Sequence, residues 1–313
     1  MTSPLLLPGR PLRTDERPSR FDVGYVTFSG FDPEMARVLA ALRAEGLTAR
    51  TARWDDPDVD WSQFATALVR SPWDYVERYQ EFLGWLRRTA TVTRVVNPAP
   101  VIEWNLDKRY LRHLSASGAP TVPTLWASAD SSPGELVGEL HERGWRELVV
   151  KPAIGAGGCQ ILRTTDPYHA AEYACRLTNG GLHALLQPYL DSIDTSGEMS
   201  IVYIGGSLSH AVRKSPYLRP EQRRDEPLLP DPAQGTEAAQ ALLEPQARHV
   251  DVAHVALNAV PFERDTLAYA RVDLVYGPQG SVLVNEVELV EPLLYLAGTP
   301  DAGARLARAV APP

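Results

Sequence analysis

Short apolar stretches rich in β-forming residues alternate with amphipathic segments over the first third of the chain. Buried strands are predicted at 21–28, 64–70 and 92–98. Asp32 and Pro33 are typical of a helix start, and the apolar spacing after them predicts a helix that ends at Gly46. A loop and a second helix are predicted within 71–88. This alternation of strands and helices predicts a small parallel α/β domain.

The pattern changes after Asp107, which is predicted to cap a helix. Further helices are expected around 133–143 and 167–178, and strands at 120–127, 146–151, 159–164 and 183–190. A glycine-rich stretch, PAIGAGG, lies between two of these strands. Together these segments predict a compact α+β unit, which we interpret as a lid.

The last third of the chain favours antiparallel hairpins. One hairpin is predicted over 198–214 around Gly205 and Gly206, and a second over 267–292. Residues 215–235 are rich in proline and charge and are expected to form a long loop. Residues 236–260 are expected to contain helix, interrupted or bounded by Pro245. The domain boundaries that follow are a mobile leader at 1–20, an N-terminal α/β domain at 21–106, a lid at 107–186 and a C-terminal unit at 187–313.

Composition excludes several classes of protein. The 313 residues include 44% hydrophobic and 22% charged residues, as in an ordinary globular protein. No apolar run approaches the roughly 18 residues that a membrane span needs. A net charge of −8 argues against nucleic acid as the main partner. Only two cysteines occur, Cys159 and Cys175, and they form no CxxC pair, so a cytoplasmic protein without disulfides is expected.

The second hairpin carries the most informative polar residues. A four-residue turn at 277–280 would pair Tyr276 with Ser281, Asp273 with Val284, and Arg271 with Glu286. Directly paired residues share one face of a sheet, so that face would hold Arg271, Asp273, Glu286 and Glu288. Clustered carboxylates suit Mg²⁺, particularly when phosphate oxygens complete its coordination. The alternative is a solvated face of an edge hairpin with one ion pair.

The glycine-rich stretch at 151–158 adds a candidate phosphate site. Its glycines let backbone N–H groups approach phosphate oxygens, and Lys151 places a cation directly before them. It is not a P-loop, because no GK[ST] ends it. The alternative here is a plain hairpin turn.

Taken together, these motifs resemble the ATP-grasp superfamily over roughly 107–311. The segments that carry the resemblance occur in the family's order: Asp107-Lys108, VVKPAIGAGG, LLQPYL, GEMSIVYIGGSLSHAVRKSP, RVDLV and NEVEL. The resemblance implies an N-terminal parallel α/β domain, a lid subdomain and a C-terminal antiparallel nucleotide and metal domain. It also implies that ATP and two Mg²⁺ ions are bound.

The resemblance implies a role for each matching residue. Mg²⁺ would be held by Asp273, Glu286 and Glu288, the last standing where many relatives have asparagine. Phosphates would contact Lys108, Lys151, Gly155, Gly157 and Gly158. Adenine and ribose would contact Gln187, Tyr189, Leu190 and Glu198. Lys214 and Arg271 would act on the γ-phosphate and on the acyl phosphate that forms.

A narrower resemblance comes from RSPWDY (70–75), NPAPVIEWNLDK (97–108) and SHAVRKSP (209–216). These motifs resemble glutathione-synthetase-like ligases, and within them the cyclo-ligases that convert O-ureido-D-serine to D-cycloserine. Such an enzyme takes a small amino-acid-like substrate, for which the candidate residues are Arg70, Ser71, Trp73 and Asp74. The alternatives are an intermolecular carboxylate–amine ligase and a non-catalytic ATP-binding regulatory protein. A homodimer and a catalytic part for His210 or the 215–235 loop stay open.

Overall fold

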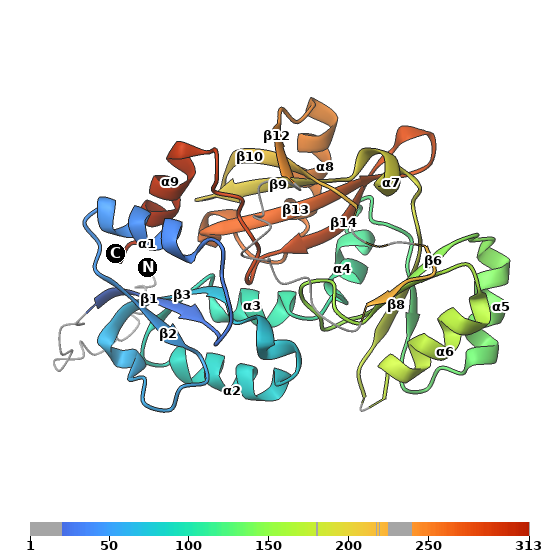
Figure 1. The fold of residues 1–313 in the computed structure, drawn as a ribbon, viewed down its shortest axis with the longest axis horizontal. Coiled ribbons are helices and arrows are strands. Elements are labelled where there is room, and N and C mark those ends of the chain that lie inside the picture. Colours follow the sequence, from blue (N-terminus) through green and yellow to red (C-terminus); the bar gives the residue numbers. More distant parts are fainter. Residues whose placement is uncertain (1–20, 180, 217, 219, 225–239, 313) are drawn as a thin grey trace, which may run out of the picture.

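The computed structural model of the chain describes residues 21–312, except 180, 217, 219 and 225–239. Within the described residues there are three β-sheets, each with its own helices (Figure 1). One sheet is parallel and two are antiparallel, so the mixed α/β and α+β fold class expected from the sequence is confirmed. The expected leader at 1–20 and most of the expected loop at 215–235 lie outside the described residues.

The N-terminal sheet has the parallel strand order β2-β1-β3-β4. Its strands are β1 (Phe21–Thr27), β2 (Ala49–Arg53), β3 (Phe64–Ser71) and β4 (Arg94–Val96). The helices near this sheet are α1 (Met35–Ala44), α2 (Tyr79–Thr89) and α3 (Ala99–Asn105). Strand β2 was missed because its sequence, ARTAR, is polar and largely exposed at the sheet edge. Helix α1 begins at Met35, two residues later than Asp32 and Pro33 predicted, although the Asp32 carboxylate still accepts hydrogen bonds from the N–H groups of Glu34 and Met35.

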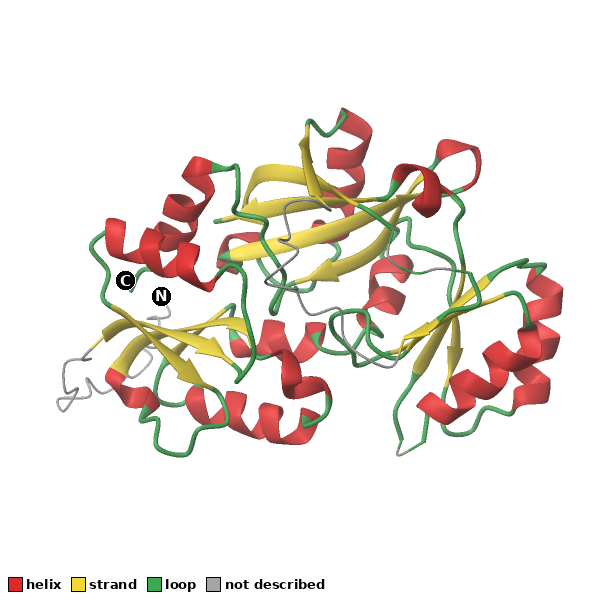
Figure 2. Ribbon diagram, viewed as in Figure 1, coloured by secondary structure: helices red, strands yellow, loops and turns green. Residues whose placement is uncertain are grey.

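The lid sheet has the antiparallel order β11-β7-β6-β8-β5. Its strands are β5 (Leu125–Ala127), β6 (Leu148–Pro152), β7 (Ile161–Thr164), β8 (Ala184–Pro188) and β11 (Arg223–Arg224). Helices α5 (Pro133–Arg143) and α6 (Pro167–Leu177) lie beside this sheet (Figure 2), and apolar side chains of both helices are buried against it. The start of α5 is set by a capping box between Ser132 and Glu135.

The C-terminal sheet has the antiparallel order β12-β10-β9-β13-β14. Its strands are β9 (Glu198–Ile204), β10 (Ser207–Lys214), β12 (Gln240–Leu243), β13 (Tyr269–Tyr276) and β14 (Val282–Glu288). The associated helices are α4 (Tyr110–Ala116), α7 (Ser192–Ser196), α8 (Ala247–Asn258) and α9 (Pro300–Val310). Both predicted hairpins are confirmed. The helix expected over 236–260 is only partly right, because residues 240–243 pair with β10 as a strand and the helix starts after Pro245.

The N-terminal and C-terminal sheets are tied together by buried contacts. Asn97 donates hydrogen bonds to the backbone oxygens of Tyr269 and Leu289, at 2.9 and 2.8 Å, and accepts one from the Ala268 N–H. The C-terminal helix α9 packs against α1, so the last helix of the chain covers the first domain (Figure 1). The expected domain boundaries stay predictions. Among the described residues, no helix has the length and apolar character needed to cross a membrane.

Candidate active site

A cavity lies where the lid sheet, strands β13 and β14, and the turn after β3 face one another. It collects most of the residues singled out in the sequence. The predicted residues that line it are Trp73, Lys108, Lys151, Gly155, Gly157, Gly158, Gln187, Tyr189, Leu190, Glu198, Lys214, Arg271, Asp273, Glu286 and Glu288. Segments from all three sheets therefore converge on one site.

The pairing of β13 with β14 differs from the predicted register. Arg271 lies opposite Glu288 and Asp273 opposite Glu286. The turn ends one residue later than expected, so that Tyr276 lies opposite Val282, and a bulge after Asp273 shifts the pairing by one more residue. Because the total shift is two, the predicted face is preserved.

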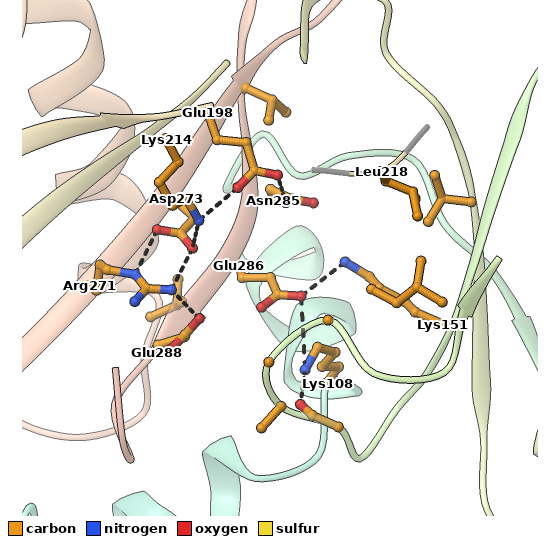
Figure 3. A pocket seen from close by; sticks show the side chains of 18 of the residues that line it. Lys108, Lys151, Glu198, Lys214, Leu218, Arg271, Asp273, Asn285, Glu286 and Glu288 are labelled. Atoms are coloured by element: carbon orange, nitrogen blue, oxygen red, sulfur yellow. Dashed lines mark hydrogen bonds and ion pairs between the residues drawn. The ribbon is translucent and has the colours of Figure 1, made fainter. Parts of the chain in front are cut away.

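Asp273 is the centre of the first ion-pair network, shown in Figure 3. The two oxygens of its carboxylate lie 2.9 Å from Nε and Nη2 of Arg271. Nζ of Lys214 lies 2.8 Å from Asp273 and 2.7 Å from Glu198, and the Ser200 hydroxyl donates to Asp273 at 2.5 Å. Burial opposes ionisation of Asp273, but the adjacent Arg271 and Lys214 outweigh it and lower the pKa of the carboxyl group.

Glu286 and Glu288 belong to separate pairs. Lys151 lies 3.0 Å from Glu286 and Lys108 lies 3.9 Å from it, while Glu288 contacts Nη2 of Arg271 (Figure 3). Partial burial opposes ionisation of Glu286, but the two lysines outweigh it and lower the pKa of the carboxyl group. Burial raises the pKa of Glu288, and the nearby charges of Asp273 and Glu286 add to this effect despite Arg271.

The three carboxylates share a face but do not converge on one point. Among the described residues, no three His, Cys, Asp or Glu side chains form a cluster with metal-binding geometry. Mg²⁺ does not require such a cage, because it is usually held by one or two carboxylates, water and substrate phosphates. Asp273 and Glu286 supply such hard oxygen donors within one cavity. The residues present thus fit Mg²⁺ bound together with a phosphate-bearing ligand.

The glycine-rich stretch forms a loop between β6 and β7 that lines the cavity. Gly157 and Gly158 have φ values of 60° and 66°, which favour glycine over residues with a Cβ atom. Lys108, which lines the same cavity, donates a hydrogen bond of 2.7 Å to the backbone oxygen of Gly155 and so holds this loop. The expected hairpin position is confirmed, and binding of phosphate by this loop stays a prediction.

Of the residues predicted to contact adenine and ribose, Gln187, Tyr189 and Leu190 lie where β8 leaves the lid sheet, and Glu198 begins β9. The Gln187 side chain donates to the Thr124 hydroxyl at 2.9 Å, and the Tyr189 hydroxyl donates to Asp194 at 2.6 Å. The Tyr189 N–H is bonded to the backbone oxygen of Glu147. A nucleotide base would therefore have to use other backbone groups of this segment.

The four residues predicted to bind substrate are divided by the structure. Trp73 lines the cavity, whereas Arg70, Ser71 and Asp74 do not. Arg70 is only 2% exposed and forms a 3.1 Å ion pair with Glu34. It is the extra residue where the pairing of β3 with β1 shifts, and its side chain extends behind the cavity wall.

Ser71 and Asp74 have partners within the N-terminal domain. The Ser71 hydroxyl donates to the Thr27 hydroxyl at 2.9 Å, and the Trp54 indole donates to Asp74 at 2.8 Å. His210 is likewise away from the cavity lining and contacts the backbone oxygen of Leu294. These positions do not support direct contact of Arg70, Ser71 or Asp74 with a substrate.

Two cavity residues had no strong signal in the sequence. Glu291 lies beyond the end of β14, where the alternation that identified Glu286 and Glu288 no longer applies. Tyr75 is buried, but it also lines the cavity and donates a 2.9 Å hydrogen bond to Glu291. Burial and the charge of Glu288 raise the pKa of Glu291 to about 7.

Comparison with known proteins agrees with this geometry. Residues 21–97 match the family described as "D-cycloserine synthetase DcsG, N-terminal domain". The chain is 37% identical over 287 residues to the cycloserine biosynthesis protein DcsG of Streptomyces lavendulae, covering 90% of this chain and 93% of that protein.

Solved structures extend the likeness to the whole fold. The crystal structure of D-cycloserine synthetase DcsG matches with a TM-score of 0.83 and 35% identity, over 92% of this chain and 97% of that one. A RimK domain ATP-grasp protein from Sphaerobacter thermophilus matches with a TM-score of 0.61 and 19% identity, over 92% and 99% of the two chains, which supports the fold alone. The chain belongs to the D-cycloserine synthetase DcsG family and is an ATP-dependent ligase with the ATP-grasp fold.

Proposed function

We propose that this ligase converts O-ureido-D-serine to D-cycloserine, with release of ADP, phosphate, CO₂ and ammonia. The observation that carries the proposal is the similarity to DcsG, which extends over 90% of the chain. The cavity supports it chemically. Lys108, Lys151, Lys214 and Arg271 supply cations for phosphates and a carboxylate, and the N-terminal domain closes one side.

In this proposal, ATP would lie between the end of β8 in the lid sheet and the paired strands β13 and β14. Its adenine and ribose would lie near Gln187, Tyr189, Leu190 and Glu198. Its phosphates would contact Lys108, Lys151 and the N–H groups of Gly155, Gly157 and Gly158. This order places the γ-phosphate toward β13 and β14, where Arg271 and Lys214 lie.

Two Mg²⁺ ions would be held by Asp273, Glu286 and Glu288. When bound, the ions neutralise charge on the phosphates and on the transferring phosphoryl group. In the structure these carboxylates are paired with Lys151, Lys214 and Arg271. Loading the site would therefore release those cations to face the phosphate oxygens.

Residues of the chain then have defined tasks in two steps. In the first, a substrate carboxylate oxygen bonds to the γ-phosphorus, and the bond from phosphorus to ADP breaks. Lys214 and Arg271 are placed to orient the carboxylate and the phosphoryl group. In the second, the oxygen-linked ureido nitrogen bonds to the carbonyl carbon, phosphate leaves, and the N–H proton passes to the phosphate or to water. Arg271 would stabilise the negative oxygen that develops.

The carbamoyl group must also be removed. Water adds to its carbon, the bond to the ring nitrogen breaks, and the resulting carbamate gives CO₂ and ammonia.

The nucleophile and the activated carboxylate belong to one molecule. Well-oriented intramolecular reactions reach effective molarities on the order of 10⁵ M or more, so a free amine at millimolar concentration would compete poorly. Trp73 would help to enclose this single substrate beside Arg271. The proposed reaction therefore requires no second amino acid.

Isotope transfer and product analysis test the proposal. O-Ureido-D-serine labelled with ¹⁸O in its carboxylate is incubated with ATP and Mg²⁺, with and without excess free amino acids. We expect one ¹⁸O atom in the released phosphate and one in the carbonyl group of the cyclic product. The mass of that product should be the same with and without added amino acids. Phosphate without label would refute carboxylate activation. A product that contains the added amino acid, or turnover only in its presence, would refute the cyclo-ligase and favour an intermolecular ligase.

A further inference from the structure

Glu291 differs from the other carboxylates of the cavity in that no lysine or arginine of the described residues forms an ion pair with it. Within the described residues, Glu198, Asp273, Glu286 and Glu288 each form an ion pair with a lysine or arginine. The hydrogen-bond partner found for Glu291 is the neutral hydroxyl of Tyr75 at 2.9 Å. A carboxylate at a partly enclosed site is stabilised by a cation, and no described lysine or arginine forms an ion pair with Glu291.

Buried residues on the side away from the cavity hold the segment that carries Glu291. Arg70 donates a 2.6 Å hydrogen bond to the backbone oxygen of Pro292, the next residue. The Glu34 carboxylate accepts hydrogen bonds from the N–H groups of Leu294 and Leu296, at 2.8 and 3.0 Å. Glu291 is thus held toward the cavity by buried contacts, which is the arrangement expected of a binding group.

Arg271 reaches the same segment. Its Nη1 donates a 3.0 Å hydrogen bond to the backbone oxygen of Leu293, two residues after Glu291. The cavity therefore has an arginine and an uncompensated glutamate beside one short stretch of chain. An α-amino acid carries a carboxylate and an ammonium group on the same carbon atom, and this pair of charges matches the arginine and the glutamate.

We infer that Glu291 binds the α-ammonium group of the amino-acid substrate, held in place by Tyr75, while Arg271 faces the substrate carboxylate. This inference rests on the proposed function, because it assumes an amino acid as the substrate. It adds a specificity-determining residue: the ammonium group takes no part in ring closure, so its recognition selects the substrate and sets its orientation. A substrate without that group would leave Glu291 unpaired.

Glu291→Gln provides the test, because it removes the charge but keeps the size and a group that can accept the Tyr75 hydrogen bond. Hydrogen bonds to charged groups contribute enough that their loss corresponds to roughly 10- to 150-fold in binding. We expect the KM for O-ureido-D-serine to rise by about that factor, with the KM for ATP unchanged. Glu77→Gln, on an exposed residue of the same wall outside the cavity lining, is the matched control and should change neither.

The des-amino analogue of the substrate completes the test. Its affinity is measured by calorimetry with a non-hydrolysable ATP analogue and Mg²⁺. Wild type should prefer O-ureido-D-serine over the analogue, and Glu291→Gln should lose most of that preference. An unchanged preference in the variant would overturn the inference. So would a fall in kcat with unchanged KM, which would identify Glu291 as a proton-transfer group.

The two proposals fail in different ways. If wild type forms D-cycloserine but Glu291→Gln keeps the wild-type KM, only the role of Glu291 is wrong. If wild type forms no D-cycloserine, the proposed function is wrong, and the role of Glu291 toward this substrate falls with it.

Discussion

Replacing Arg70 separates a structural role from a role in substrate binding. The sequence motif RSPWDY predicts that Arg70 contacts the substrate, but the structure buries it behind the cavity wall. There it pairs with Glu34 at 3.1 Å, donates to the Pro292 backbone oxygen and lies over the Tyr269 ring at 5.1 Å. Arg70→Met removes the charge and the hydrogen bonds but keeps much of the apolar side chain.

The magnitude follows from what the substitution leaves behind. Breaking a buried ion pair from one side typically costs about 3–5 kcal/mol, because the remaining charge is uncompensated. Glu34 would still accept two backbone hydrogen bonds, from Leu294 and Leu296, and two nitrogens of Arg70 have no partner in the native structure. Both facts place the cost near the lower end, at about 3 kcal/mol. At roughly 2–4 °C per kcal/mol for domains of 150–250 residues, the expected fall in Tm is about 6–12 °C.

Calorimetry and steady-state kinetics on the same preparations provide the assay. The double variant Arg70→Met/Glu34→Gln should be less destabilised than the sum of the two single variants, because removing both charges leaves neither unpaired. At a temperature where Arg70→Met is folded, its KM for the substrate should rise modestly and its KM for ATP should not change. An unchanged Tm together with a large, selective rise in the substrate KM would refute this reasoning and restore Arg70 as a substrate ligand.

Three further predictions concern the cavity. Asp273→Asn and Glu286→Gln should each abolish ATP turnover while the folded state survives, because each removes a hard anionic ligand; wild-type-like turnover in both would contradict the metal site. Hydrogen exchange at 153–160 should slow when ATP and Mg²⁺ are added, since the loop N–H groups then gain phosphate partners; equal exchange would argue against a phosphate-covering loop. The pKa of Glu291 rises from 4.5 to about 7 on folding, so its contribution favours the folded state at low pH and is lost as pH rises toward and through 7. As pH rises from 5 to 8 in denaturant titrations, the free energy of unfolding of Glu291→Gln should therefore increase relative to that of wild type. A difference between the two proteins that does not depend on pH would contradict the pKa shift.

The face that carries the reactive residues could be predicted because it depends on alternation alone. Arg271, Asp273, Glu286 and Glu288 are separated by even numbers along their strands, so any register shift of two preserves their common face. The register itself could not be predicted. The bulge after Asp273 depends on how β13 pairs with its partner, and the sequence has no local mark for it.

The substrate side was harder to predict because contacts distant in the sequence define it. Arg70 lies at the end of an apolar strand, a usual place for ligand-binding residues, but its partners Glu34 and Pro292 are 36 and 222 residues away. Glu291, by contrast, is identified from the structure and not from the sequence. Nothing in its local sequence distinguishes it from a surface glutamate, and only the fold shows that it faces the cavity and forms no ion pair with the described residues.

The charges of the cavity explain how it can hold a highly charged ligand set. Four cations and five carboxylates line it, which leaves a formal charge of −1. ATP with two Mg²⁺ ions is close to neutral, and so is an amino acid that carries one carboxylate and one ammonium group. Loading all of them would leave the net charge nearly unchanged, whereas ATP or the metal ions alone would leave a large uncompensated charge in a partly buried site. The existing pairs would exchange partners: carboxylates would turn from lysine and arginine to metal, and the released cations to phosphate. In this scheme Glu291 is the carboxylate with no cation to exchange, so its partner has to arrive with the substrate.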